Sequence, residues 1–556
     1  MNLLKRFVLL MSLILFSCSA PNNRSTVVVG VKADPDQINP VTHVSAFGRI
    51  LCTGLFPRLL ESEFDTVTGI IRYQPLLAKR YEFSQDHKSL TYFLRSDVFW
   101  EDGERVTAKD IKFTFELINN PDVASSKKDQ LQMLDIDEKG TLDKAIKIVN
   151  DSTITFCFKQ ANPLQIYDSN LQPGFLPYHL LKDIKPADLR THPLNLKPIS
   201  AGPYRLSLWK KQEQIVFETR SECSVPGPGK IDRIVFRVIP EYTTRLTSLK
   251  TGEVDVMYPI NPQDVAQIKK ENSDIRIEVM KARYYDYIGW QNIDQMAYHA
   301  SNGKTIKPHP LFGNKNVRRA LTIAINRQEI VDGFLGEYGQ QAVSPISPVF
   351  KWAFNDSLKP LPFDPVLAKD ILKREGWGDH DGDGILDRNG LKFEFDLYYD
   401  AGNDRREFAA LIIQRNLGAI GIKARVQSVE TNVFYDNELK KNYDAFISGI
   451  GVTLQIDPTS EWNSDLKQNA YNDVSYQNPE VDKLIEKGKS YVNYLDAAPT
   501  WKKFQSILYE DQPATFLFWR DEIVGYHRRI KNTHTSILGE IDKYWLWNIN
   551  NDDEVR

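Results

Sequence analysis

The sequence is poor in cysteine, has no excess of either charge and lacks long apolar runs. Its 556 residues contain 4 Cys, and 70 Lys and Arg stand against 73 Asp and Glu, which gives a formal net charge of −3. No Cys/His cluster has the spacing of a zinc site, so a metal-stapled scaffold is not expected. Nucleic-acid-binding proteins need a basic face, and the balanced charge argues against that class. A polytopic membrane protein is excluded, because it needs several apolar runs of about 20 residues.

The longest apolar run stands near the start of the chain and indicates the compartment. After two basic residues, Phe7–Phe16 is apolar, and Ser and Cys18 follow. This run is too short to span a bilayer comfortably but suits the core of a signal peptide. The small residue before Cys18 resembles a bacterial lipoprotein cleavage site, with an ordinary secretory signal as the alternative. We predict a lipoprotein signal peptide at 1–17, a linker at 18–25 and lipid on Cys18. The lipid would anchor the protein to a membrane in the periplasm or cell envelope.

The other cysteines add little to this prediction. They are Cys52, Cys157 and Cys223. Because their number is odd, at most one disulfide can form among them, and the sequence leaves open whether it does. The fold must therefore depend on its hydrophobic cores.

The chain has ample apolar material in alternating strands and helices. Hydrophobic residues make up 42% and aromatic residues 11%, and the length suggests three or four domains or subdomains. The β-branched run Thr26–Lys32 predicts a buried strand, and apolar residues at helical spacing predict a helix over Ser45–Leu60. Thr107, followed three residues later by Asp110, predicts the capping box of another helix. The continuing alternation predicts two mixed α/β lobes, the second inserted between strands of the first.

Short motifs follow one another in a characteristic order over nearly the whole chain after the linker. They include Leu55–Leu60, Pro75–Ala78, Trp100–Gly103, Gly202–Tyr204, Gly252–Asp255, Val317–Leu321, Gly376–Trp377, Tyr443–Asp444 and Asn478–Asp482. Their order and spacing resemble those of the family-5 extracytoplasmic solute-binding proteins, the peptide-type binding proteins of ABC transporters. The resemblance implies an α/β, two-lobed periplasmic-binding-protein fold of the peptide type, with an extra subdomain in the first lobe.

The same resemblance divides the chain between the two lobes. Lobe 1 is expected at 26–46, 184–287 and, on its return, 513–556, its extra subdomain at 47–183, and lobe 2 at 288–512. Two segments, Tyr284–Asn292 and Asp511–Tyr526, are expected to cross between the lobes.

A tethered, two-lobed α/β protein places a ligand site in the cleft between its lobes. The resemblance implies the substrate-binding component of an ABC importer. Such a protein captures peptides or a similar small polar solute, closes by a hinge motion, and delivers the solute to permease and ATPase subunits. We expect a monomer that binds no nucleic acid. A receptor for non-peptide cargo, such as a metal chelate, a saccharide or an opine-like compound, is the alternative.

Catalysis has little support in the sequence. We find no G-x-S-x-G elbow, H-E-x-x-H pair or Walker loop, and the nine His residues are scattered. We predict no enzyme activity and no cofactor apart from the calcium candidate below, and a secreted hydrolase is a remote alternative.

The acid–proline pair at Asp457 provides the first candidate ligand contacts. In the family that the chain resembles, an Asp three residues before such a pair often holds the ammonium group of the ligand, but Leu454 stands there in this chain. Because Leu cannot hold a charged amine, peptide recognition by that route is in question unless Asp457 takes the role. Gln455 and Trp462 nearby suit a polar ligand with an apolar flank.

Further candidate contacts come from an aromatic strand and a loop histidine. Tyr287, Trp290 and Asn292 belong to a run that alternates along a strand, so half of the run should face a core while the other half could line the cleft. His43 follows the first strand, in a region where the family contacts ligand. Core packing is the alternative for the strand residues, and simple solvation is the alternative for His43.

An Asp/Gly-rich loop offers a candidate metal site. Asp379, Asp381, Asp383 and Asp387 occupy positions 1, 3, 5 and 9 of a calcium-loop pattern. The acid usual at position 12 is missing, since Gly390 stands there. The pattern predicts either a weak structural Ca²⁺ site or a solvated turn.

Overall fold

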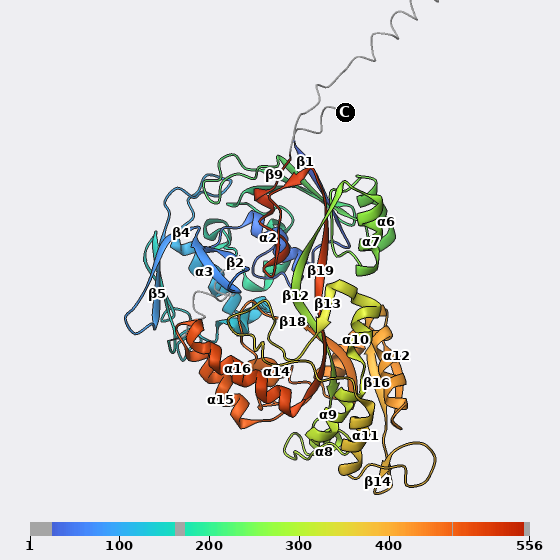
Figure 1. The fold of residues 1–556 in the computed structure, drawn as a ribbon. Helices are drawn as coiled ribbons and strands as arrows, with labels where there is room; N and C mark the ends of the chain where they lie inside the picture. Colours follow the sequence, from blue (N-terminus) through green and yellow to red (C-terminus); the bar gives the residue numbers. More distant parts are fainter. Residues whose placement is uncertain (1–24, 162–172, 470, 550–556) are drawn as a thin grey trace, which may run out of the picture.

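Two long antiparallel strands, β12 (Ile275–Trp290) and β19 (Ala514–His527), run through the molecule and join its two lobes (Figure 1). The computed structural model describes residues 25–161, 173–469 and 471–549. The described chain begins and ends in the first lobe, and its middle builds the second lobe (Figure 1).

An 11-stranded sheet continues through both lobes. Outward from β19, the first lobe adds β11 (Val256–Met257), β1 (Thr26–Val31), β10 (Arg233–Val238), β9 (Gln214–Thr219) and β8 (Tyr204–Lys210). Outward from β12, the second lobe adds β18 (Ala445–Gly451), β16 (Glu394–Asp400) and β17 (Lys423–Val429), while β13 (Gly339–Gln341) pairs with β19. The strands β12 and β19 therefore belong to both lobes.

The strand β1 forms where the β-branched run predicts it. Val27 and Val29 are fully buried, and β1 lies parallel to both β10 and β11. A strand covered on both faces needs a continuous apolar run rather than an alternating one, which explains the sequence TVVVGV.

The extra subdomain of the first lobe has its own four-stranded sheet. Its order is β4 (Ala78–Phe83), β5 (Ser89–Leu94), β7 (Thr153–Cys157) and β6 (Ile146–Asn150). The helix α3 (Ala108–Asn119) packs on this sheet, with the rings of Phe115 and Phe156 centred 5.2 Å apart. The predicted capping box is confirmed, because the Thr107 side chain accepts from the helix start and Asp110 accepts from the Thr107 N–H.

The helix predicted over Ser45–Leu60 is shorter than expected. It is α2 (Ala46–Leu55), capped by Ser45, whose side chain accepts from the Gly48 N–H at 3.0 Å. Pro57 disfavours helical backbone at the residue before it, so the chain leaves the helix at Phe56. The hairpin of β2 (Leu60–Asp65) and β3 (Ile70–Pro75) follows instead.

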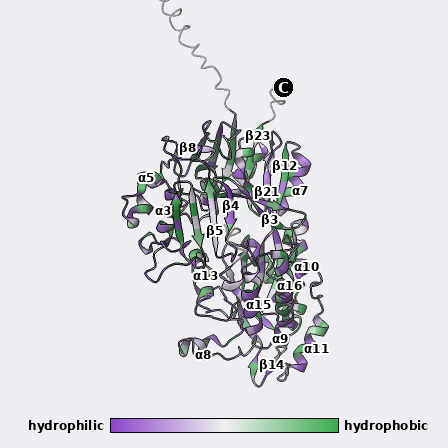
Figure 2. Ribbon diagram, turned by 90° about the vertical axis from the view of Figure 1, so that its left-hand side faces the viewer, coloured by the Kyte–Doolittle hydropathy of each residue, from purple (hydrophilic) through white to green (hydrophobic). Residues whose placement is uncertain are grey.

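The second lobe has a separate core between β16–β18 and three helices, α9 (Lys315–Ala324), α11 (Pro365–Arg374) and α12 (Asp404–Gly418). Figure 2 shows both hydrophobic and hydrophilic residues within α11, whose buried face carries Ala368 and Leu372. Another pair in the same lobe, α15 (Pro479–Ser490) and α16 (Tyr494–Asp511), packs together outside this core (Figure 1). Other helices are α5 (Tyr178–Leu181), α6 (Tyr242–Lys250), α7 (Pro262–Glu271), α8 (Gln295–Ala300), α10 (Arg327–Ile330), α13 (Thr431–Leu439) and α14 (Thr459–Trp462).

The described residues show whether the cysteines pair and whether any helix could cross a membrane. Cys52, Cys157 and Cys223 are free thiols, so no disulfide forms among them. Among the helices of these residues, none combines the length and the apolar character needed to cross a membrane. Cys18 lies outside the described residues.

Candidate functional site: a cleft between the lobes

The segment that follows β18 contributes to three neighbouring cavities, two of which have walls from both lobes. We call the largest of these the cleft cavity; it measures about 260 Å³ and lies between first-lobe residues and Leu454. A smaller pocket of about 50 Å³, the Trp462 pocket, is lined by second-lobe residues, including Gln455 and Asp457, and by Tyr285 of β12. A third pocket shares Leu454 with the first and Gln455 with the second, so the three follow one wall.

Two basic side chains of the first lobe, Lys127 and Arg49, lie near His43 in the lining of the cleft cavity, and we call this part of the lining its Lys127 end. Lys127 Nζ lies 2.9 Å from the His43 Nε2 atom and donates to the Pro40 carbonyl. Arg49 reaches the same cavity from α2. Burial, helped by the charge of Lys127, lowers the pKa of His43 to about 3, and burial lowers the pKa of Lys127 to about 8. At neutral pH the histidine is therefore uncharged and the lysine is mostly protonated.

A second group of lining residues, around Arg58 and Asp542, is more balanced in charge. Arg58 pairs with Glu61 at 3.0 Å and lies over the Trp545 ring, 5.6 Å from its centre. Burial, together with the charge of Glu61, raises the pKa of Asp542 to about 6. Arg58 and Asp542 both line the cavity.

The second-lobe wall is a turn held by its own backbone. The Asp457 N–H donates to the Gln455 carbonyl at 3.1 Å, and the exposed Asp457 carboxylate lies 3.8 Å from Lys489 Nζ. Gln455 Nε2 is buried and has no partner among the described residues. Trp462 packs against Phe516, with ring centres 5.7 Å apart, and is almost fully buried.

The structure brings four of the predicted ligand contacts to these cavities. Gln455, Asp457 and Trp462 line the Trp462 pocket, and His43 lines the cleft cavity. Trp462 gives the pocket an apolar wall but is mainly a core residue. Tyr285, from the aromatic strand, also lines the Trp462 pocket.

Three other predicted contacts, those of the aromatic strand, do not line these cavities. The Trp290 indole donates to Thr515 Oγ1 at 2.9 Å, inside the second-lobe core. The Asn292 amide donates to three backbone carbonyls, and the buried Tyr287 hydroxyl donates to Asp473. The alternation along β12 could not decide this, because a strand face lines a cavity only where no other segment packs on it. Here Phe312 packs on Trp290 and Asp473 meets Tyr287.

The Asp-rich loop gathers three of its four predicted carboxylates. Ligand atoms of the exposed Asp379, Asp381 and Asp383 lie within 4.8 Å of one another. The Lys392 ammonium already pairs with two of them, Asp381 at 2.8 Å and Asp383. Asp387 is not part of the group, since it accepts from the His380 backbone at 2.9 Å. This geometry adds no support for a bound Ca²⁺.

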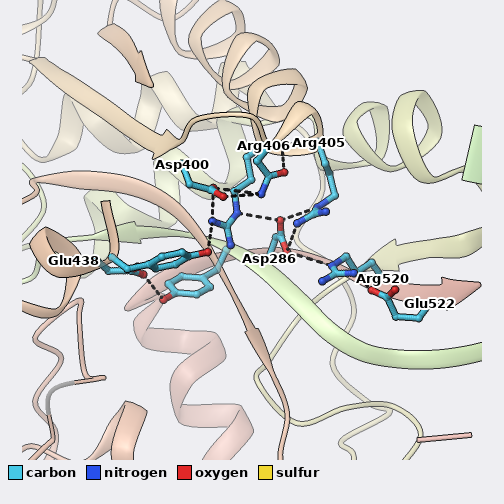
Figure 3. A network of polar contacts seen from close by, with 10 residues as sticks. Asp286, Asp400, Arg405, Arg406, Glu438, Arg520 and Glu522 are labelled. Atoms are coloured by element: carbon cyan, nitrogen blue, oxygen red, sulfur yellow. Dashed lines mark hydrogen bonds and ion pairs between the residues drawn. The ribbon is translucent and has the colours of Figure 1, made fainter. Parts of the chain in front are cut away.

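A buried ion-pair network, which sequence reasoning missed, lies where β12 meets the second lobe (Figure 3). Asp286, 1% exposed, lies 3.0 Å from Arg405, 3.6 Å from Arg406 and 3.8 Å from Arg520. Arg406 also reaches Asp400 at 2.5 Å. The adjacent arginines on α12 are visible in the sequence, but nothing local shows that they share an acid more than 100 residues away.

The pairing of β12 with β19 breaks next to this network. Lys281–Arg283 stand opposite the single residue Asp521, and Ala282 has a φ of +46°. The Asp521 carboxylate accepts from the Ala282 N–H at 2.9 Å and from Lys281 Nζ at 2.6 Å. This is a β-bulge at the point where both strands pass from one lobe to the other.

The β2–β3 hairpin of the first lobe contacts the second lobe across the cleft. Lys351 Nζ donates to the Thr66 carbonyl at 2.8 Å, and the Tyr494 hydroxyl donates to the Ile71 carbonyl at 2.9 Å. A Cβ atom on Gly69 would lie 2.5 Å from the Lys351 nitrogen, so the two backbones are in close contact. The lobes are therefore together in this structure.

Comparison with known proteins relates the chain to one family of solute-binding proteins. The model of the family described as bacterial extracellular solute-binding proteins, family 5 Middle, matches residues 72–472. The oligopeptide-binding protein AppA of Bacillus subtilis is 28% identical over 467 residues, which cover 82% of this chain and 80% of AppA. The dipeptide-binding protein of Escherichia coli K12 is 24% identical over 552 residues, which cover 93% and 94%.

Two solved structures have the same architecture. The B. subtilis AppA complex with a nonapeptide gives a TM-score of 0.75 at 24% identity and covers 94% of this chain and 99% of that one. The NikZ complex with Ni(L-His) from Campylobacter jejuni gives 0.75 at 25% identity, with the same coverage.

Proposed function

Because the chain belongs to family 5 of the bacterial extracellular solute-binding proteins, we propose that it captures peptides between its lobes and delivers them to the permease of an ABC importer. The observation that carries this proposal is the pair of cavities with walls from both lobes, one of them lined by Gln455, whose buried Nε2 atom lacks a partner among the described residues. Buried polar groups are rarely left unpaired, so a polar solute is the natural partner. The peptide names of AppA and the E. coli relative support the cargo class.

The family and its structural neighbours are solute-binding proteins rather than enzymes. We assign no reaction to the chain and expect it to act as a monomer.

We further propose that the lobes close about the bulge at Lys281–Arg283 and Asp521. A hinge is a short segment that absorbs the change in backbone angles, and this bulge lies within both connecting strands. It supports lobe boundaries near residues 282 and 521. The expected boundary at 287/288 lies five to six residues after Ala282 in β12, and the one at 512/513 lies eight to nine residues before Asp521, just ahead of β19.

Membrane anchoring through Cys18 stays part of the proposal. The described chain begins at the outer end of the first lobe, away from the second lobe (Figure 1). A tether there would leave the lobes free to open and close.

Native mass spectrometry of the purified protein tests the cargo directly, because a closed binding protein can retain its solute. Peptides released on denaturation would support the proposal. A rise in melting temperature with a peptide pool would support it as well, since a hundredfold excess over Kd adds about 2.7 kcal/mol to the free energy of unfolding. A stabilising metal chelate or saccharide, with no response to any peptide, would contradict it and favour the non-peptide alternative.

A further inference from the structure

The Lys127 end of the cleft cavity carries positive charge without a matching acid. Among the ion pairs of the described residues, none joins a carboxylate to Lys127 or Arg49, although the chain has 73 Asp and Glu. The carboxylate whose charge acts on Lys127 is that of Asp36. Its oxygens already accept from Val44 and Ser45 at the start of α2.

One N–H group of the Lys127 ammonium has no acceptor among the described residues. Its ammonium has three N–H groups, of which one meets the Pro40 carbonyl and one meets His43 Nε2. Because an ammonium can only donate, His43 Nε2 must accept, and the ring proton must then sit on Nδ1. That Nδ1 atom is buried and has no partner among the described residues.

Arg49 adds further donors to the same end. Its side chain is exposed and makes one long hydrogen bond, 3.5 Å from Nη1 to the Leu538 carbonyl. Arg58, the third cation of the cavity, is held by Glu61 in the second group of lining residues, near Asp542. The free donors therefore gather where Lys127, His43 and Arg49 line the cavity.

Leu454 faces these groups from the second lobe. It stands where the family pattern leads one to expect an Asp for an ammonium group. An acid at this position would neutralise the cations, and the leucine leaves them available. The absence of an acid at Leu454 and the unneutralised cations both disfavour a ligand ammonium group and favour an anionic ligand.

We propose that this end of the cleft cavity binds a carboxylate of the solute through Lys127, Arg49 and the His43 Nδ1–H, and that the solute needs no free amino group there. The inference rests on the proposed function and narrows its substrate class. It predicts anionic solutes, with the carboxylate coming from a peptide C-terminus or from an acidic side chain.

Peptide pools with different ends test this inference. We would compare random tetrapeptides without Asp or Glu in three forms: free, N-acetylated and C-amidated. A fourth pool, amidated but with one Glu, tests a side-chain source. The free and N-acetylated pools should bind alike, and amidation should weaken binding roughly ten- to a hundredfold, as expected when charge-assisted hydrogen bonds are lost. Recovery with the Glu pool would identify a side-chain carboxylate as the source.

Variants connect the effect to these residues. Lys127→Gln and Arg49→Gln should each weaken binding of the free pool at least roughly tenfold and reduce its dependence on salt. Lys128→Gln removes the same charge from an exposed neighbour and should bind like wild type. Leu454→Asp should shift the preference toward peptides with a free amine. Circular dichroism and the unliganded melting temperature show whether each variant is folded.

The outcomes separate the two proposals. If amidated peptides bind as well as free ones, or if acetylation costs as much as amidation, the inference is wrong while the peptide-binding function stands. If no pool binds in any form, the proposed function fails, and the inference falls with it.

Discussion

Replacing Gly69 by alanine should weaken solute binding by forcing the lobes apart. Gly69 ends the turn of the β2–β3 hairpin with a φ of +73°. An added Cβ would lie 2.5 Å from the Lys351 nitrogen and 2.9 Å from the Phe350 Cα, and nearer still to the Val349 carbonyl oxygen. All of these atoms are backbone atoms of the second lobe, so no side-chain rotation can relieve the overlap.

The magnitude follows from two separate costs. The left-handed conformation costs a non-glycine residue about 1–2 kcal/mol, and this cost is the same whether the lobes are open or closed. Overpacking costs about 1–3 kcal/mol and acts on the closed form alone. Since the binding-competent form becomes rarer by that amount, the apparent Kd should rise roughly 5- to 150-fold.

The control is Gly140→Ala. Gly140 has a φ of +76° in the same subdomain, and a Cβ there would meet no atom within 4 Å. Both variants should lose similar stability without ligand, but Gly69→Ala alone should lose affinity in calorimetry with a peptide recovered from the native protein. Small-angle scattering should show that the liganded Gly69→Ala variant is less compact. Equal affinities for the two variants would refute the role of the hairpin in closure.

Three further predictions concern stability and anchoring. Asp286→Asn should lower the free energy of unfolding by about 3–5 kcal/mol, because three arginines around a buried site lose the acid they share. Urea denaturation measures this, and Asp370→Asn, which breaks an exposed pair, should change the free energy of unfolding by less than about 1 kcal/mol. Equal effects of the two variants would contradict the network. The pKa of Asp542 is raised from an ordinary 3.8 to about 6, so the wild type loses stability as pH rises from about 4 to above 6. Asp542→Asn should therefore be more stable than wild type by up to about 3 kcal/mol at pH 8 and equally stable at pH 3.5. A stability gain that does not depend on pH would argue against the shift. Cys18→Ser should abolish acyl labelling and release the protein from membranes, and continued membrane association would exclude the lipoprotein assignment.

Local sequence patterns determined much of the fold because their physical causes are local. A β-branched run such as Thr26–Val31 suits a strand covered on both faces, and a Thr with an Asp three residues on can satisfy the first N–H groups of a helix wherever the helix lies. The order of short motifs identified the two-lobed architecture. The error at Ser45–Leu60 has a local cause as well, since apolar periodicity continued past Pro57 while the backbone could not.

The composition of the cleft was decided only by the tertiary structure. His43, Arg49 and Lys127 come from three segments, and no spacing in the sequence shows that they share one cavity with Leu454. The same holds for Trp290, whose place in the strand pattern fits either a cleft or a core. The tertiary structure puts it in the second-lobe core, against Phe312 and Thr515. Sequence periodicity reports which residues share a face of one element, whereas a binding site depends on which faces meet, and that is set by long-range packing of the two lobes.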